Sequence, residues 1–159
     1  MASCAHAGET KPVNEAALEG ALADAEARCA DASERLTGPR RRVLELLLRA
    51  EGPAKAYDLI AGFGESGQAA KPPTVYRALD FLEKQGFVHR IESMNAYVAC
   101  KRVGETHSAA FLICDCCGAT REVAPFSSKN ISGLFAGSGY EISTLTVEAR
   151  GLCAACRAG

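Results

Sequence analysis

Apolar residues recur at helical spacing in four segments of the first hundred residues. The first predicted helix runs from Glu15 to Ala32 and carries one apolar stripe, at Leu18, Leu22, Ala25 and Cys29. A second helix begins after Thr37, which is placed to cap it, with Pro39 in the first turn, where the missing N–H costs nothing. A short third helix over Lys55 to Ala61 is ended by the glycine-rich segment Gly62 to Gly67.

The fourth of these helices opens at Lys71 and is followed by two short strands. Two prolines fix its entry, Gly86 supplies its stop, and its apolar side chains share one face (Val75, Leu79 and Leu82). The segments Phe87 to Glu92 and Asn95 to Cys100 are then predicted to be two short strands that form a β-hairpin. Three helices followed by a hairpin are the order of a winged helix. The third helix of that fold, here the one that opens at Lys71, enters the major groove of DNA.

The remaining third of the chain has a different pattern. A short polar segment is followed by two predicted strands, a helix and a final strand, at Ala109 to Cys114, Thr120 to Ala124, Phe126 to Gly139 and Tyr140 to Ala149. The fold class is therefore α+β. We expect residues 1–100 to form an N-terminal helix and a winged-helix DNA-binding domain, residues 101–107 a hinge, and residues 108–159 a small α/β domain. The thin core and open strand edges of that last domain favour dimerisation.

Charge changes this picture only locally. The 159 residues have a net charge of −1 and contain no long apolar run, which indicates a soluble chain without membrane spans. Between Arg35 and Arg77, however, eight Lys and Arg residues face four Asp and Glu residues. A basic stretch in the winged helix indicates contact with the phosphates of double-stranded DNA, although a solvated charged face is the ordinary alternative for Arg40, Arg41 and Arg42.

Two Cys-x-x-Cys pairs carry the clearest chemistry. Cys114 and Cys117 form one pair, and Cys153 and Cys156 form the other. Four thiolates make a closed tetrahedral zinc site, which stabilises a fold and leaves no position for substrate. Disulfides or a redox dithiol are the alternative, but no secretory segment precedes the cysteines, and we expect a cytoplasmic protein. Cys116 is expected to be a spare thiol.

Four further residues could form a second metal site. His89, Cys100, His107 and Glu122 offer a thiolate, two imidazoles and a carboxylate, a mixed set that suits Zn²⁺. Each of them alone is more often an ordinary surface or core residue. Because they come from both sides of the predicted hinge, an ion bound by all four would fix the angle between the domains. The sequence therefore predicts a regulatory zinc site that acts as a conformational switch.

Several motifs resemble the ferric uptake regulator family from about Arg35 to Cys156. They are the segment Leu36 to Arg40, the segment Lys71 to Leu79, Gly86-Phe87-Val88-His89, and the two cysteine pairs with their glycines. The segments around Ala70, Tyr97 and Thr106 are most similar to the zinc uptake regulators within that family. The resemblance implies a dimeric zinc-responsive repressor of zinc uptake genes, with two Zn²⁺ per protomer at the two sites above. We expect DNA contacts from Arg40, Tyr57, Lys71, Thr74, Tyr76 and Arg77.

One departure from the family bears on the metal. The His-His-x-His run of its iron and peroxide regulators is reduced here to His107, which argues against an all-His and carboxylate site for Fe²⁺. A His-rich tail is absent after Cys156, and whether a third metal site exists stays open. An iron- or manganese-responsive regulator is the alternative within the family, and a redox sensor using Cys100 and Cys116 is the alternative from another class. No nucleophile with a positioned base is recognisable, so we expect no enzyme.

Overall fold

The chain divides into two compact units that are described separately. The computed structural model describes residues 14–50, 52–64, 71–100, 109–123, 133, 135–140 and 145–158. One unit lies within Thr10–Gly104, and we call its described residues the helical unit. The other lies mainly within Glu105–Gly159, and we call its described residues from position 109 onward the sheet unit. The predicted domain boundaries and the hinge stay predictions, because residues 101–108 lie outside the described residues.

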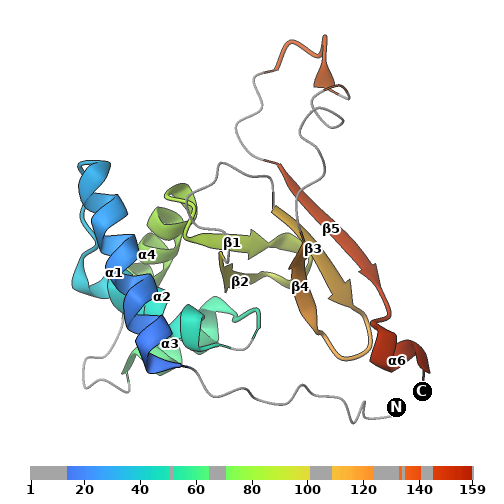
Figure 1. Cartoon of the computed structure of the whole chain (residues 1–159), viewed down its shortest axis with the longest axis horizontal. Coiled ribbons are helices and arrows are strands. Elements are labelled where there is room, and N and C mark those ends of the chain that lie inside the picture. The colour runs from blue at the N-terminus through green and yellow to red at the C-terminus, as the bar shows by residue number, and fades with distance from the viewer. Residues whose placement is uncertain are drawn as a thin grey trace. The chain divides into compact units, whose positions relative to one another are not determined.

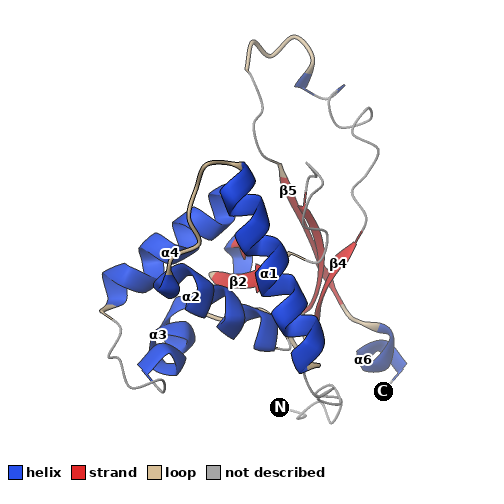
Figure 2. Cartoon of the chain, turned by 60° about the vertical axis from the view of Figure 1, so that its left-hand side comes forward, coloured by secondary structure: helices blue, strands red, loops and turns tan. Residues whose placement is uncertain are grey.

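The helical unit contains four helices and a β-hairpin (Figures 1 and 2). The helices are α1 (Glu15–Asp31), α2 (Gly38–Arg49), α3 (Ala56–Gly64) and α4 (Pro72–Lys84). The hairpin joins β1 (Val88–Ile91) to β2 (Ala96–Ala99) through the 3₁₀ turn η1 (Glu92–Met94). A backbone bridge from Ala54 to Tyr97 adds a third short segment beside β2. This order confirms the predicted winged helix.

The core of the helical unit is built around α4. Val75, Leu79 and Leu82 are fully buried, as the predicted stripe requires. They belong to one cluster with the buried face of α1 and with apolar residues of α2, α3 and the hairpin. Gly86 ends the helix with φ of +73°, a conformation that glycine adopts without steric cost. The sequence pattern therefore located both the helix and its termination correctly.

Two local predictions in this unit need correction. Helix α3 does not stop before Gly62 but continues to Gly64, and Phe63 in this extra turn is buried. A Cβ at Gly62 would lie 3.3 Å from Leu46, so the glycine allows α2 and α3 to approach closely rather than breaking the helix. Thr37 occupies the N-cap position of α2, yet its side chain makes no capping hydrogen bond.

The sheet unit is a three-stranded sheet followed by a short helix. Its strands are β3 (Ala109–Cys114), β4 (Thr120–Val123) and β5 (Thr146–Gly151), in the order β4-β3-β5. β3 runs antiparallel to β4 and parallel to β5 (Figure 1). Helix α6 (Ala154–Ala158) was not predicted. Most of the predicted helix Phe126 to Gly139 lies outside the described residues, and the last strand extends beyond Ala149 to Gly151.

Candidate metal centre and nucleic-acid interface

The four predicted cysteine ligands lie together in the sheet unit. The Sγ atoms of Cys114, Cys117, Cys153 and Cys156 all lie within 4.8 Å of one another. The distance between the Sγ atoms of Cys117 and Cys153 is 3.9 Å. A tetrahedron with metal–sulfur bonds of about 2.3 Å has sulfur–sulfur edges of about 3.8 Å. The cluster therefore has the donor type and the size that a tetrathiolate zinc site requires.

The β-sheet and two tight turns explain this convergence. Cys114 is the last residue of β3, and the turn after it closes with a hydrogen bond of 2.9 Å from the Gly118 N–H to the Cys114 carbonyl oxygen. Gly118 has φ of +72°. Cys153 lies two residues after the end of β5, and Cys156 lies in α6. Because β3 and β5 are parallel neighbours, their carboxyl ends lie side by side, and both cysteine pairs therefore lie at the same end of the sheet.

Hydrogen bonds move the pKa values of two of these thiols in opposite directions. Hydrogen bonds from the backbone of Cys117, and then of Cys153, lower the pKa of Cys114 to about 6. The Cys153 N–H, for example, donates to the Cys114 Sγ at 3.3 Å. The neighbouring Cys153 thiol and burial raise the pKa of Cys156 to about 12. The cluster thus offers one readily formed thiolate beside a thiol whose ionisation needs a positive charge, which a bound metal supplies.

Cys116 differs from the other described cysteines. It is disulfide-bonded. The other six described cysteines are in no disulfide. The expectation of a spare thiol is therefore wrong. Spacing alone could not decide this, because a disulfide depends on how the fold places two cysteines in space.

Two of the four predicted regulatory ligands lie close together in the helical unit. His89 on β1 is half-buried, Cys100 after β2 is 5% exposed, and their ligand atoms lie within 4.8 Å of each other. The hairpin brings them near, since the Cys100 N–H donates to the Phe87 carbonyl oxygen at 2.9 Å. Glu122 lies on β4 of the sheet unit, opposite Phe111. His107 lies outside the described residues.

The predicted DNA-contacting side chains are mostly accessible. Tyr57 on α3 is 78% exposed and Tyr76 on α4 is 48% exposed. Lys71 and Arg77 are also exposed, and Thr74 is half-buried near the start of α4. Tyr57 and Tyr76 are therefore accessible to a partner, and their role as DNA contacts stays a prediction.

Arg40 is engaged within the helical unit itself. Its guanidinium carbon lies 3.4 Å from the centroid of the Phe81 ring, and its Nη1 donates to the Arg35 carbonyl oxygen at 2.6 Å. Phe81 belongs to α4, so this stacking joins the start of α2 to the predicted recognition helix.

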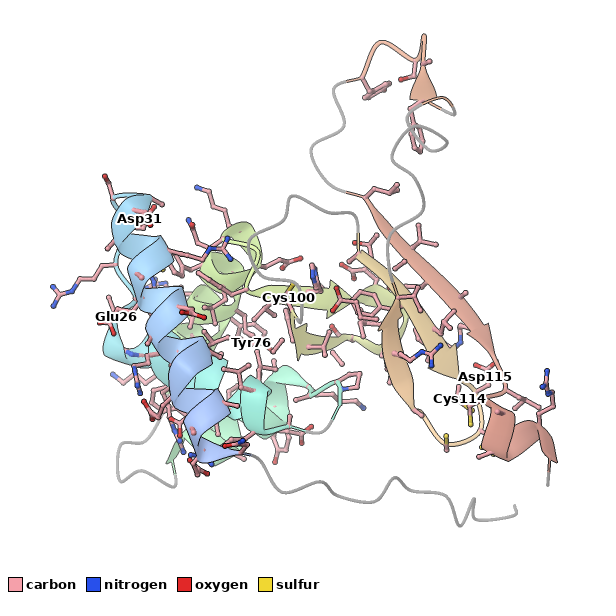
Figure 3. The ribbon with its side chains drawn as sticks, in the orientation of Figure 1. Glu26, Asp31, Tyr76, Cys100, Cys114 and Asp115 are labelled. Atoms are coloured by element: carbon pink, nitrogen blue, oxygen red, sulfur yellow. The ribbon has the colours of Figure 1, made fainter. Side chains whose placement is uncertain are left out.

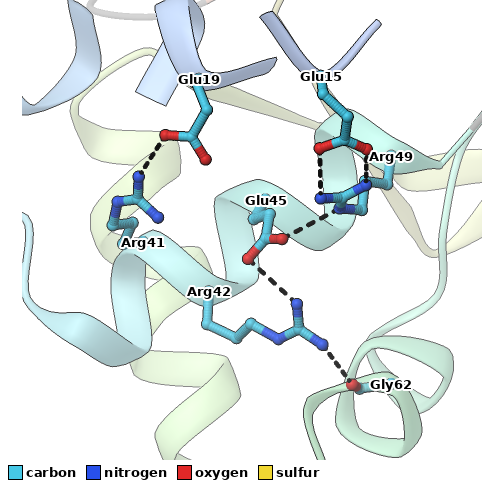
Figure 4. Close-up of polar contacts among 7 residues, drawn as sticks. All are labelled: Glu15, Glu19, Arg41, Arg42, Glu45, Arg49 and Gly62. Atoms are coloured by element: carbon cyan, nitrogen blue, oxygen red, sulfur yellow. Dashed lines mark hydrogen bonds and ion pairs between the residues drawn. The ribbon is translucent and has the colours of Figure 1, made fainter. Parts of the chain in front are cut away.

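The other arginines of α2 face carboxylates (Figure 4). Arg49 donates to both carboxylate oxygens of Glu15 on α1, at 2.7 and 3.0 Å, and its Nε donates to Glu45 at 3.0 Å. Arg42 donates to Glu45 and to the Gly62 carbonyl oxygen, both at 3.1 Å. A pair at 3.0 Å also joins an α2 arginine to α1, between Arg41 and Glu19. Much of the local positive charge seen in the sequence is therefore neutralised, partly by acids from outside that stretch.

These features define a class of protein, a winged helix combined with a small cysteine-rich sheet unit that can hold a metal ion. Among the described residues, no helix is long and apolar enough to cross a membrane. The sequence matches the model of the Ferric uptake regulator family over residues 31–150. The chain belongs to this family.

Several relatives are similar over most of the chain. The Zinc uptake regulation protein of Escherichia coli (strain K12) is 47% identical over 137 residues, which cover 85% of this chain and 80% of that protein. A solved Zinc Uptake Regulator complexed with zinc and DNA superposes with a TM-score of 0.82 at 45% identity, covering 89% of this chain and 95% of the other. A structure of holo XcZur gives a TM-score of 0.76 at 42% identity, covering 87% and 97%.

Proposed function

We propose that this protein is a zinc-responsive, DNA-binding transcriptional repressor of zinc uptake genes, acts as a cytoplasmic homodimer, and is not an enzyme. The observation that carries the proposal is its similarity, at 45% identity and a TM-score of 0.82, to a zinc uptake regulator bound to zinc and DNA. The cysteine cluster and the exposed tyrosines of the winged helix support it independently, since they supply a metal site and a contact surface.

The first proposed zinc ion is structural. Cys114, Cys117, Cys153 and Cys156 would hold it, and a closed four-sulfur site contributes folding energy without offering a position for chemistry. Its role is to keep the ends of β3 and β5 together. Among the described residues β4 and β5 are the edge strands, and these edges and the exposed Leu112 on β3 suit the sheet unit to pairing with a second copy of the chain.

The second proposed zinc ion is regulatory. His89 and Cys100 would bind it from the helical unit, His107 from the end of the hinge at residues 101–107, and Glu122 from beyond the hinge. A soft thiolate among the ligands favours zinc over iron or manganese. A ligand shifts a conformational equilibrium by its differential affinity for the two states. A site completed by both sides of a hinge would therefore favour one arrangement of the two DNA-binding heads of a dimer.

The proposed DNA contacts centre on α4. Tyr76 and Arg77 lie on its exposed face, Lys71 and Thr74 at its start, and Tyr57 on the neighbouring helix α3. Arg40 belongs to this set through its contact with Phe81 on α4, which would let it position the helix as well as approach a phosphate. In a dimer, two such helices would read half-sites about one turn of DNA apart.

The test is DNA binding under buffered zinc. A duplex is first selected from a random pool by the zinc-loaded protein, and its binding is then followed by fluorescence anisotropy as free zinc is raised, with Fe²⁺ and Mn²⁺ in parallel titrations. We expect binding that rises steeply with zinc alone. Equal responses to Fe²⁺ or Mn²⁺, or binding that is independent of metal, would contradict the proposal.

A matched pair of cysteine variants compares the loss of a proposed regulatory ligand with the loss of a buried cysteine that binds no metal in the proposal. Cys100→Ser should abolish the zinc response while one tightly bound zinc remains in each chain. Cys29→Ser, which changes a cysteine buried on α1 far in sequence from any proposed ligand, should keep the response. A Cys100→Ser protein that still responds to zinc would rule out the proposed regulatory site.

A further inference from the structure

An ion pair joins the two halves of the cysteine cluster. The Nε and Nη2 atoms of Arg150 donate to Oδ1 of Asp115 at 2.8 and 2.7 Å. Asp115 directly follows the ligand Cys114, and Arg150 lies on β5, three residues before the ligand Cys153. Figure 3 labels Cys114 and Asp115 beside α6, at the end of the sheet where the sulfur atoms gather. The pair thus links one cysteine turn to the strand that leads into the other.

The sheet register explains why these two side chains meet. Arg150 is the β5 partner of Ile113 on β3, and Asp115 lies two residues beyond Ile113. Side chains two residues apart on a strand project on the same side of a sheet, so Arg150 and Asp115 are diagonal neighbours across the β3–β5 pairing. The Asp115 N–H also donates to the Gly151 carbonyl oxygen at 2.8 Å, which extends the backbone pairing one residue past Cys114.

Such a link matters because the two cysteine pairs are far apart in sequence. Cys117 and Cys153 are separated by 36 positions, and bringing their segments together costs loop-closure entropy. Groups that orient metal ligands without touching the metal commonly tune metal affinity. The backbone bond at Asp115 and the side-chain bonds at Arg150 both hold the cysteine pairs at the spacing a metal needs.

We propose that Asp115 and Arg150 are positioning residues for the four-cysteine site, and that their ion pair slows the release of the bound zinc ion. This inference rests on the proposed structural zinc site. A second effect must be distinguished from it. Four thiolates and one Zn²⁺ carry a net charge of −2, so the Arg150 cation could stabilise the site by charge alone, and the Asp115 carboxylate would then weaken it.

The experiment measures zinc release from the full-length protein. After EDTA treatment has removed weakly held metal, release of the remaining zinc to the chromophoric chelator 4-(2-pyridylazo)resorcinol is followed for the wild type and for Asp115→Asn, Arg150→Gln and the double variant. Both partners are about half exposed, so we expect each single variant to release zinc about two to five times faster. The double variant should be no faster than the faster single variant, because the pair acts as one unit.

Two further variants complete the design. Arg121→Gln removes a charge from the exposed face of β4, where the described residues give Arg121 no ion pair, and should release zinc at the wild-type rate. Arg150→Lys keeps the charge but loses the two-nitrogen contact, so it should lie between Arg150→Gln and the wild type.

Each outcome has a separate meaning. If Asp115→Asn slows release while Arg150→Gln accelerates it, charge alone acts and the positioning role is overturned. Single variants that match Arg121→Gln, or a double variant whose acceleration is the product of the two single effects, would overturn it as well. If the wild type retains no zinc that Cys114→Ser loses, the structural zinc site itself fails, and the inference fails with it.

Discussion

The helical unit and the sheet unit differ in where their apolar side chains lie. In the helical unit, buried residues from all four helices and the hairpin form one cluster around α4. Among the described residues of the sheet unit, the buried apolar side chains all lie on β3, and the last of them is the proposed ligand Cys114. An apolar core can stabilise the first unit, whereas the second, with the proposed structural zinc, would draw stability from the cluster of sulfur atoms at the end of its sheet.

The largest expected effect follows from removing the metal. Cys114→Ser, or a strong zinc chelator, should abolish tight zinc binding and disorder the sheet unit, because a structural zinc site contributes on the order of 10 kcal/mol at neutral pH. The amide signals of the helical unit in an NMR spectrum should keep their dispersion, while those of the sheet unit collapse. Cys29→Ala serves as the control and should keep its zinc. Simultaneous collapse of both units would contradict this contrast.

Truncation of a side chain in the core should destabilise the helical unit and leave zinc binding by the sheet unit unchanged. Leu79 on α4 is fully buried, and Leu79→Ala should lower the free energy of unfolding of the helical unit by about 2–5 kcal/mol. Asp80→Ala, at the exposed neighbouring position, should change it by less than about 0.5 kcal/mol. Denaturant melts with zinc analysis in parallel would check this. A loss of bound zinc in Leu79→Ala would show that the two units are not stabilised separately.

These contrasts also explain how far the sequence could predict the structure. The stripe of α4 is a local pattern, and it was confirmed because its residues lie on one helix whose period is fixed. The fold also brings the four cysteines together, while their role as zinc ligands stays a prediction. The length of α3 was underestimated, because Gly62 reads as a helix breaker until Leu46 is known to pack against it. Helix α6 was missed because its five residues are too few to show a helical period.

The arginines of α2 show a different limit of sequence reasoning. Their positive charge is evident along the chain, but Glu15 and Glu19 come from a separate helix, so the ion pairs depend on how α1 packs on α2 (Figure 4). The ligand set of the proposed regulatory site has the same limit. The fold places His89 and Cys100 together, and the role of Glu122 stays a prediction.

The ion pairs lead to a prediction about DNA binding. Arg77→Gln should weaken binding roughly tenfold and reduce the slope of log affinity against log salt concentration by about 0.9, if Arg77 neutralises one phosphate. Arg49→Gln should leave the slope unchanged, because Arg49 is held by Glu15 and Glu45. Anisotropy titrations at several salt concentrations measure both. An equal change of slope in the two variants would mean that the α1–α2 ion pairs open on DNA.

The smallest expected effect concerns pH and two carboxylates of the helical unit. Burial acts to raise the pKa of Glu45, but hydrogen bonds from Arg42 and Arg49 outweigh it and lower that pKa. Its stabilising contribution is therefore present above the ordinary carboxyl pKa of about 4.3 and is lost as pH falls through the lowered value. Glu45→Gln should cost about 1 kcal/mol at pH 7 and close to nothing in strong acid.

Glu83 provides the matched control of opposite sign. Burial raises the pKa of Glu83, so its contribution is fully present below about pH 4.3 and is lost as pH rises through the raised value. Glu83→Gln should therefore become more stable relative to the wild type as pH rises. Denaturant melts between pH 3 and 7 measure how the free energy of unfolding of each variant differs from the wild type. The same pH dependence in both variants would contradict the opposite directions assigned to the two pKa shifts.

The most direct test is a count of zinc ions by native mass spectrometry. For the zinc-replete wild type, the proposed sites predict a dimer with two zinc ions in each chain, and for Cys100→Ser a dimer with one. Cys114→Ser should lose the tight zinc ion together with the ordered sheet unit. A wild-type dimer with a single zinc ion per chain, or a Cys100→Ser protein that loses all of its zinc, would contradict the separation of a structural site from a responsive one.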